Sequence, residues 1–174
     1  MSALRLAVPG APMGAAEVAA LRDAVRRADL DAEVLAILLA AGTAFGGPLA
    51  SDDEASAAFV ELLLAIRETP KPVVALVEGD AAAAGATLAA AADLVLCTAP
   101  AQFRPVPGAG DAPPVGTVLL ARRIGEGRTL ALLLTGGALD AQQGQQVGLV
   151  SGFAPGGTGE IVVSAVLAEL ERRG

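Results

Sequence analysis

The 174-residue chain contains no histidine, tryptophan or tyrosine, and aromatic residues make up only 2% of it. The absence of histidine removes the commonest general base and the commonest metal ligand found in proteins. Because there is also only one cysteine, Cys97, the usual cysteine and histidine zinc sites are excluded, as is an internal disulfide. We therefore expect neither a metal site nor a bound cofactor.

Long apolar runs and an excess of positive charge are also missing. No apolar run approaches the ~18–20 residues that are needed to span a bilayer. The N-terminus lacks the basic start and long apolar segment of a signal peptide. The formal net charge of −7 argues against nucleic acid or an anionic membrane surface as a partner. We therefore expect a cytoplasmic protein that binds neither nucleic acid nor membranes.

The sequence is rich in small and medium apolar residues, with a hydrophobic content of 53%. Because aromatics are so few, the core must be built from alanine, valine, leucine and isoleucine. The length is that of one domain with a sizeable core, and no linker or internal repeat divides it. We expect a single domain over residues 1–174.

The stretch from Lys71 to Cys97 carries the clearest pattern in the chain. An unbroken apolar run after a proline is typical of a strand that is buried on both faces. A run of alanines has high helix propensity and little side-chain bulk, which lets other backbone approach closely. The pattern predicts a strand over 73–77, a turn over 78–80, a helix over 81–92 and a strand over 94–97.

The rest of the chain also alternates between strand-like and helix-like patterns, which predicts a parallel sheet with helices on its faces. Capping boxes and glycines mark several helix ends. The expected strands are 4–8, 34–39 and 149–150, the expected helices include 14–30, 115–123 and 127–134, and residues 101–114 are expected to be irregular. Ser51 and Glu54 open a further helix that buries Phe59, Leu62, Leu63 and Ile66, and another helix begins at Asp140 with Gln143 and ends at Gly148. The last helix begins at Thr158 and buries Ile161, Val162, Ala165 and Leu170.

Three ordered motifs in this chain resemble those of the crotonase (enoyl-CoA hydratase/isomerase) superfamily. They are Lys71, Pro72, Gly79, Ala81, Gly85, Leu88 and Asp93 of the central stretch; Ala44-Phe45 and Ala101-Gln102-Phe103; and Leu133 to Gly136, Ala141 and Gly148 to Val150. The resemblance covers nearly the whole chain. It implies a crotonase-like α/β fold, a ββα spiral with stacked sheets and flanking helices, and a homo-oligomer that is a trimer or a multiple of one. Family members usually continue with C-terminal helices, so we expect a single crotonase-like domain that lacks this extension.

The resemblance also implies an oxyanion hole, in which two backbone N–H groups polarise a thioester carbonyl. By position these are the amides of Leu49 and Ala84, and Phe45 belongs to the substrate-binding loop.

Alanine and proline replace glycines of the family pattern beside both amides, at Pro48 and within Ala83–Gly85. Because these residues adopt fewer backbone conformations than glycine, a preserved hole and a distorted one are both open from the sequence. The alternative is that residues 81–86 serve only close helix packing.

Hydratases of this family use two glutamates, and here their positions hold Thr87 and Pro107, neither of which can act as a carboxylate base. Asp80 and Asp111 are the candidate substitutes, although turn-forming and solvated roles are favoured over a catalytic role for both. Arg104 is a candidate for binding a CoA phosphate or a substrate carboxylate, and a surface salt bridge is its alternative role.

Two classes of function remain open from the sequence. The first is an enoyl-CoA hydratase/isomerase-family protein that binds an acyl-CoA thioester and, if active, works as a lyase or isomerase and not as an efficient hydratase. The second is a catalytically inactive structural or accessory subunit that assembles with a partner enzyme. The missing glutamates favour the second class, and the intact motifs around the oxyanion hole keep the first.

Overall fold

The computed structural model describes residues 2–10, 12–105, 114–155 and 158–173. Pro107 and Asp111, two of the residues singled out from the sequence, lie outside these described residues.

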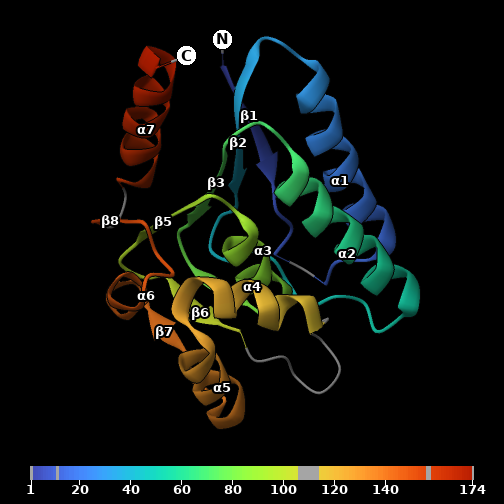
Figure 1. The fold of residues 1–174 in the computed structure, drawn as a ribbon, viewed down its shortest axis with the longest axis vertical. Coiled ribbons are helices and arrows are strands. Elements are labelled where there is room, and N and C mark those ends of the chain that lie inside the picture. The colour runs from blue at the N-terminus through green and yellow to red at the C-terminus, as the bar shows by residue number, and fades with distance from the viewer. Residues whose placement is uncertain (1, 11, 106–113, 156–157, 174) are drawn as a thin grey trace.

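A five-stranded parallel sheet forms the centre of the molecule, with strand order β1-β2-β3-β5-β8 (Figure 1). Each neighbouring pair runs parallel, with Leu38 opposite Val74 and Val74 opposite Leu94. All five residues of β3 are buried, as its unbroken apolar run predicts. The strands are β1 (Ser2–Ala7), β2 (Val34–Ala40), β3 (Val73–Val77), β5 (Leu94–Thr98) and β8 (Gly152–Ala154).

A second, three-stranded sheet is built from short strands with the order β4-β6-β7. They are β4 (Asp80–Ala82), β6 (Gln102–Arg104) and β7 (Leu139–Asp140); β4 runs parallel to β6, and β6 antiparallel to β7. Two strands, one from each sheet, precede α3 (Ala84–Ala91) and again precede α4 (Pro114–Ile124). This repeat of strand, strand and helix is the ββα spiral with stacked sheets and flanking helices that the sequence predicts.

Helices cover both faces of the main sheet. The larger core lies on the side of α1 to α6, and a smaller core of Leu38, Val74, Leu76, Leu96 and neighbouring residues lies beneath α7. The other helices are α1 (Ala15–Leu30), α2 (Asp53–Glu68), α5 (Glu126–Thr135), α6 (Ala141–Val147) and α7 (Gly159–Arg173).

The helix caps follow the sequence at one predicted site and differ from it at another. Asp140 and Gln143 form the expected capping box of α6, and Gly148 ends that helix with φ of 87°. At α2 the prediction of Ser51 is wrong, because Asp52 is the N-cap and accepts a hydrogen bond from the Ala55 amide at 2.6 Å. A carboxylate at this position also complements the helix dipole.

The predicted helix over 81–92 begins later than expected, because residues 80–82 form β4. Pairing of Ala81 with Phe103 in the second sheet overrides the helix propensity of the alanines. The predicted strand over 149–150 is also wrong. The amides of Leu149 and Val150 both donate to the carbonyl of Gly144, so these two residues close the end of α6.

The last helix buries a side that matches the predicted one only in part: Val162 packs against the main sheet as predicted. Val163 of α7 is 2% exposed and packs on the main sheet, whereas Ile161 is 67% exposed. Thr158 immediately precedes α7: its carbonyl accepts from the amides of Ile161 and Val162, and its hydroxyl donates to the Pro155 carbonyl. None of the helices in the described parts of the chain is long and apolar enough to cross a membrane.

Candidate functional site

The loop after β2 and the start of α3 meet backbone against backbone. A Cβ atom added to Gly85 would lie 1.8 Å from the carbonyl oxygen of Phe45, and one added to Gly46 would lie 2.6 Å from the Cα of Gly85. Gly46 also has φ of 73°, a conformation that favours glycine. Both glycines are therefore required for the two segments to approach this closely.

Leu49 lies in the first of these two segments, in a bridge to Met13 that leaves its own amide unused. The Met13 amide donates to the Pro48 carbonyl at 2.8 Å, and the Ala50 amide donates to the Met13 carbonyl at 2.9 Å. Within the described residues, the Leu49 amide donates to no other group. The Leu49 side chain is buried, which fixes the loop to the core.

Ala84 is the first residue of α3, where backbone N–H groups have no partner inside the helix. The preceding residue, Ala83, has φ of 46° and ψ of −111° and is the only non-glycine residue with positive φ in the described parts of the chain. Such a conformation costs an L-residue about 1–3 kcal/mol. The backbone therefore holds a strained turn immediately before the Ala84 amide.

Thr87 is buried inside the fold, one turn into α3. Its hydroxyl donates to the Ala83 carbonyl at 3.3 Å, and a Cβ atom on Gly116 of α4 would lie 2.6 Å from its Oγ1. The side chain at this family glutamate position is thus enclosed between α3 and α4. It carries no group that could act as a base near neutral pH.

Asp80 connects the two segments through its backbone. Its amide donates to the Thr43 carbonyl at 3.0 Å and its carbonyl accepts from the Phe45 amide at 2.8 Å. Its carboxylate lies 3.3 Å from Nε of Arg104, although Oδ1 is buried without a well-oriented hydrogen bond. The two side chains are about half exposed, so the alternative role considered for Arg104, a surface salt bridge, is present in the structure.

Phe45, predicted to lie in a substrate-binding loop, has a fully buried side chain in the main core. The side chain anchors the loop, and its backbone carbonyl lies against Gly85 of α3. Asp80 bonds the Phe45 backbone, and Gly85, the residue after Ala84, lies against Phe45 and Gly46, in the same loop that continues to Leu49. Arg104 joins them through Asp80.

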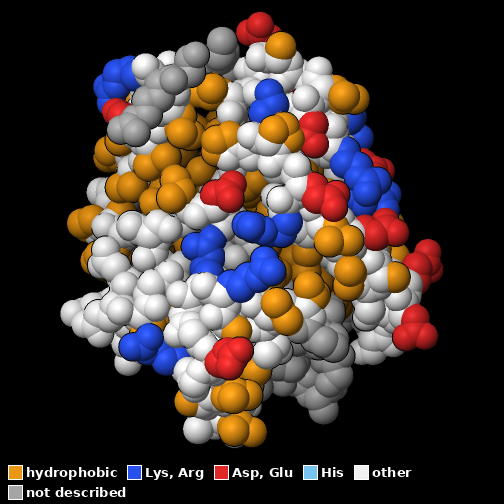
Figure 2. Space-filling view, viewed as in Figure 1, with side chains coloured by type: hydrophobic (Ala, Val, Ile, Leu, Met, Phe, Trp, Pro, Cys, Tyr) orange, Lys and Arg blue, Asp and Glu red, His pale blue; other side chains and the backbone are white. Residues whose placement is uncertain are grey.

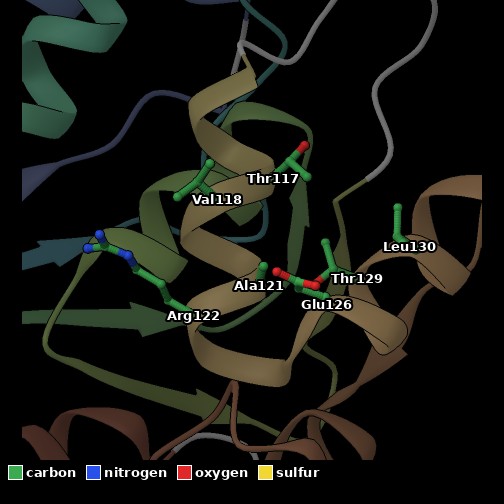
Figure 3. A pocket seen from close by; sticks show the side chains of 7 residues that line it. All are labelled: Thr117, Val118, Ala121, Arg122, Glu126, Thr129 and Leu130. Carbon is green, nitrogen blue, oxygen red and sulfur yellow. The ribbon is translucent and has the colours of Figure 1, made fainter.

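A groove lies elsewhere, between α4 and α5 (Figure 3). It has a volume of about 420 Å³, and neither Leu49 nor Ala84 lines it. The groove is mainly apolar, and Glu126 and Thr129 point into it beside Ala121. It is lined by Thr117, Val118, Ala121, Arg122, Glu126, Thr129 and Leu130.

Ionisable side chains of unusual pKa are few. Burial raises the pKa of the Cys97 thiol to about 11, so this thiol stays protonated near neutral pH. Within the part of the chain that the structure describes, no group of three or more cysteine, aspartate or glutamate residues could hold a metal ion.

Two features of this region were not anticipated from the sequence. The positive φ of Ala83 is signalled only by alanine standing where the family pattern has glycine. The second is the pair Arg67 and Arg123, which contact the far end of α3 through backbone carbonyls. No sequence pattern indicates such contacts, because any residue supplies a carbonyl.

Comparison with known proteins identifies the family. The family model for enoyl-CoA hydratase/isomerase matches residues 20–171. A solved structure of an enoyl-CoA hydratase/isomerase family protein from Silicibacter pomeroyi is 33% identical, with a TM-score of 0.85 over 97% of this chain and 79% of that one.

Among curated proteins, a putative enoyl-CoA hydratase of Thermus thermophilus is 40% identical over 89 residues. The 1,2-epoxyphenylacetyl-CoA isomerase of Escherichia coli is 36% identical over 96 residues. Each alignment covers 51% of this chain and only 35% of the relative, so the chain spans about a third of the curated relatives it matches. On the family match and the shared fold, this chain belongs to the enoyl-CoA hydratase/isomerase family.

Proposed function

We propose that the protein binds the carbonyl of an acyl-CoA thioester between the amides of Leu49 and Ala84. The observation that carries this proposal is the contact at Gly46 and Gly85, which joins the two segments that hold these amides. Neither amide donates a hydrogen bond to another described residue, so both N–H groups are available to a ligand. Backbone donors directed at a developing oxyanion are often the largest single contribution to catalysis.

The reaction class that fits these residues best is isomerase or lyase chemistry through an enolate, and not hydration. Hydration of a double bond needs a base that deprotonates water, and the enclosed Thr87 hydroxyl cannot supply one. Asp80 is the candidate proton carrier among the described residues, once its contact with Arg104 is released. A relative whose name is that of an acyl-CoA isomerase supports this class.

A catalytically inactive accessory subunit is the second candidate function. It is favoured by the pairing of Asp80 with Arg104 and by the strained alanine before Ala84. In this case the same scaffold would serve assembly with a partner enzyme. The two candidates differ in whether the chain binds a thioester carbonyl at all.

Calorimetric titration with butyryl-CoA and with free CoA tests the proposal, because only the former carries the thioester carbonyl. Two variants of Leu49 form a matched pair. Leu49→Pro removes the N–H and shortens the side chain, whereas Leu49→Ala shortens the side chain and keeps the N–H. The bridge to Met13 uses the Pro48 carbonyl and the Ala50 amide, and neither substitution removes these groups.

We expect the wild type to bind butyryl-CoA more tightly than free CoA. Leu49→Pro should bind butyryl-CoA about 2- to 12-fold more weakly than Leu49→Ala, the value of one hydrogen bond. Circular dichroism confirms that both variants are folded. Equal affinity of the wild type for butyryl-CoA and CoA, or equal affinity of the two variants for butyryl-CoA, would overturn the carbonyl-binding proposal. Folded protein that ignores both ligands would favour the accessory role.

A further inference from the structure

Helix α3 has almost no side chains that could fix its position by interlocking with its neighbours. Seven of its eight residues are alanine, glycine or threonine, and Leu88 is the only large one. All eight are buried. Helices normally lock together through ridges of side chains that fit into grooves, and α3 presents only shallow ridges. Its axial position must therefore depend strongly on contacts at its two ends.

The C-terminal end of α3 is held by hydrogen bonds to its last four carbonyl groups. Such carbonyls have no partner inside a helix and are costly to bury without one. The Ala92 amide serves the carbonyls of Leu88 and Ala89. The two that remain accept from guanidinium groups: Ala90 from Nε of Arg123 at 2.9 Å, and Ala91 from Nη1 of Arg67 at 3.5 Å.

Arg123 is the stronger of these two contacts, because it forms a second bond just beyond the helix. Its Nη2 donates to the Asp93 carbonyl at 3.3 Å, so one rigid guanidinium joins the end of α3 to the start of β5. Arg123 belongs to α4 and Arg67 to α2. Three helices therefore converge at this point, and Figure 2 shows basic side chains grouped near the centre of the face over α3 and α4.

The opposite end of α3 carries the Ala84 amide and rests on the Phe45 carbonyl through Gly85. An eight-residue helix is only ~12 Å long and rigid along its axis. A displacement at the arginine end therefore reaches the amide with little loss. Charge acts in the same direction, since cations at a helix C-terminus stabilise the helix dipole.

We propose that Arg123, assisted by Arg67, is a positioning residue that sets the axial position of α3 and thereby aims the Ala84 amide at a bound thioester carbonyl. This inference rests on the proposed function, since it assigns a role within the same carbonyl-binding site. The side chain itself is not expected to touch the ligand. Burial lowers the pKa of the Arg123 guanidinium, which nevertheless remains charged at neutral pH.

The neighbouring residue supplies a matched control. Arg122 lies on the same helix, and its side chain is exposed with no hydrogen bond or ion pair to the described residues. Arg123→Met keeps much of the aliphatic stem and removes every donor, and Arg122→Met makes the same change where no carbonyl is held. Arg123→Lys keeps the charge but replaces the planar fork with a single ammonium group.

Infrared difference spectroscopy of bound butyryl-CoA, labelled with ¹³C at the thioester carbonyl, reports how strongly the Ala84 amide is hydrogen-bonded to that carbonyl. Hydrogen bonding to the carbonyl lowers its stretching frequency. We expect the wild type and Arg122→Met to show the same lowering, Arg123→Met to show less, and Arg123→Lys to be intermediate. A merely structural role for Arg123 would lower the melting temperature and leave the carbonyl frequency of the bound ligand unchanged.

The outcomes separate this inference from the function on which it rests. If the wild type binds butyryl-CoA without lowering the carbonyl frequency, the proposed function fails. If the wild type lowers it and Arg123→Met lowers it equally, only the positioning role is overturned. Should Arg123→Met not fold, Arg67→Met and Arg123→Lys carry the test, and a wild-type frequency in both would overturn the role.

Discussion

Replacing Gly85 with alanine tests whether the contact between the two loop segments is as close as the structure has it. The added Cβ atom would lie 1.8 Å from the Phe45 carbonyl oxygen. Real Cβ contacts essentially never fall below 3.0 Å, so one of the two segments must move by at least 1.2 Å. The neighbouring atom is backbone, held by the bond from the Phe45 amide to the Asp80 carbonyl, and cannot rotate away.

Two opposing effects set the size of the change. Overpacking of a rigid region costs about 1–3 kcal/mol and occasionally more, and the upper end applies where backbone must shift. Alanine is favoured over glycine within a helix by about 1 kcal/mol, which offsets part of this cost. The free energy of unfolding should therefore fall by about 2 kcal/mol. For a chain of this length that corresponds to a melting temperature about 4–8 °C lower.

Thermal unfolding followed by far-ultraviolet circular dichroism is the suitable assay, since the chain has no tryptophan or tyrosine to report by fluorescence. Gly127→Ala in α5 is the control, because a Cβ atom there would meet nothing within 4 Å. It should raise stability by about 0.5–1 kcal/mol. If Gly85→Ala were as stable as Gly127→Ala, the close approach of the two segments would be refuted.

Three further predictions concern chemistry, pH and assembly. The protein should not hydrate crotonyl-CoA at an ordinary enzymatic rate, because Thr87 cannot act as the base, and turnover abolished by Asp80→Asn would contradict this assignment. The pKa of Cys97 is raised from 9.0 to about 11 in the folded protein, so its contribution to stability is fully present below pH 9 and is lost as the pH rises toward 11. Chemical denaturation across this range should show a decline in the free energy of unfolding, and Cys97→Ala should reduce that decline. Leu130 and Leu134 of α5 are 54% and 84% exposed, and light scattering at micromolar concentration should show a homo-oligomer, a trimer or a multiple of one, whereas a monomer would contradict this.

The sequence predicts the central strands β2, β3 and β5 well because they carry an apolar pattern typical of burial on both faces, whereas it places the last strand at 149–150 and misses β8. Val73 to Val77 is an unbroken apolar run, and the structure buries every residue of it. The sequence also predicts the capping box of Asp140 and Gln143, because the two residues lie within four positions of each other. Local patterns of this kind do not depend on the rest of the fold.

The start of α3 and the buried side of α7 could not be predicted, because other parts of the chain decide them. Alanines 81 and 82 favour a helix by themselves, and only pairing with β6 makes them a strand. Ile161 and Val163 of α7 are equally apolar, and contact with the main sheet selects Val163. Arg123 carries no local signal, since its partners are carbonyls of residues about 30 positions away.

The turn at Ala83 has a consequence for the handedness of the residue that occupies it. For a D-alanine, φ of 46° and ψ of −111° are the mirror image of −46° and 111°, close to a favoured turn conformation of an L-residue. D-alanine would therefore relieve the backbone strain without adding the flexibility of glycine, and its methyl group would take the place of the present Hα. The single cysteine at position 97 lies where synthetic segments 1–96 and 97–174 would be joined by chemical ligation. The mirror-image residue at position 83 should thus relieve the strain of the turn that precedes α3.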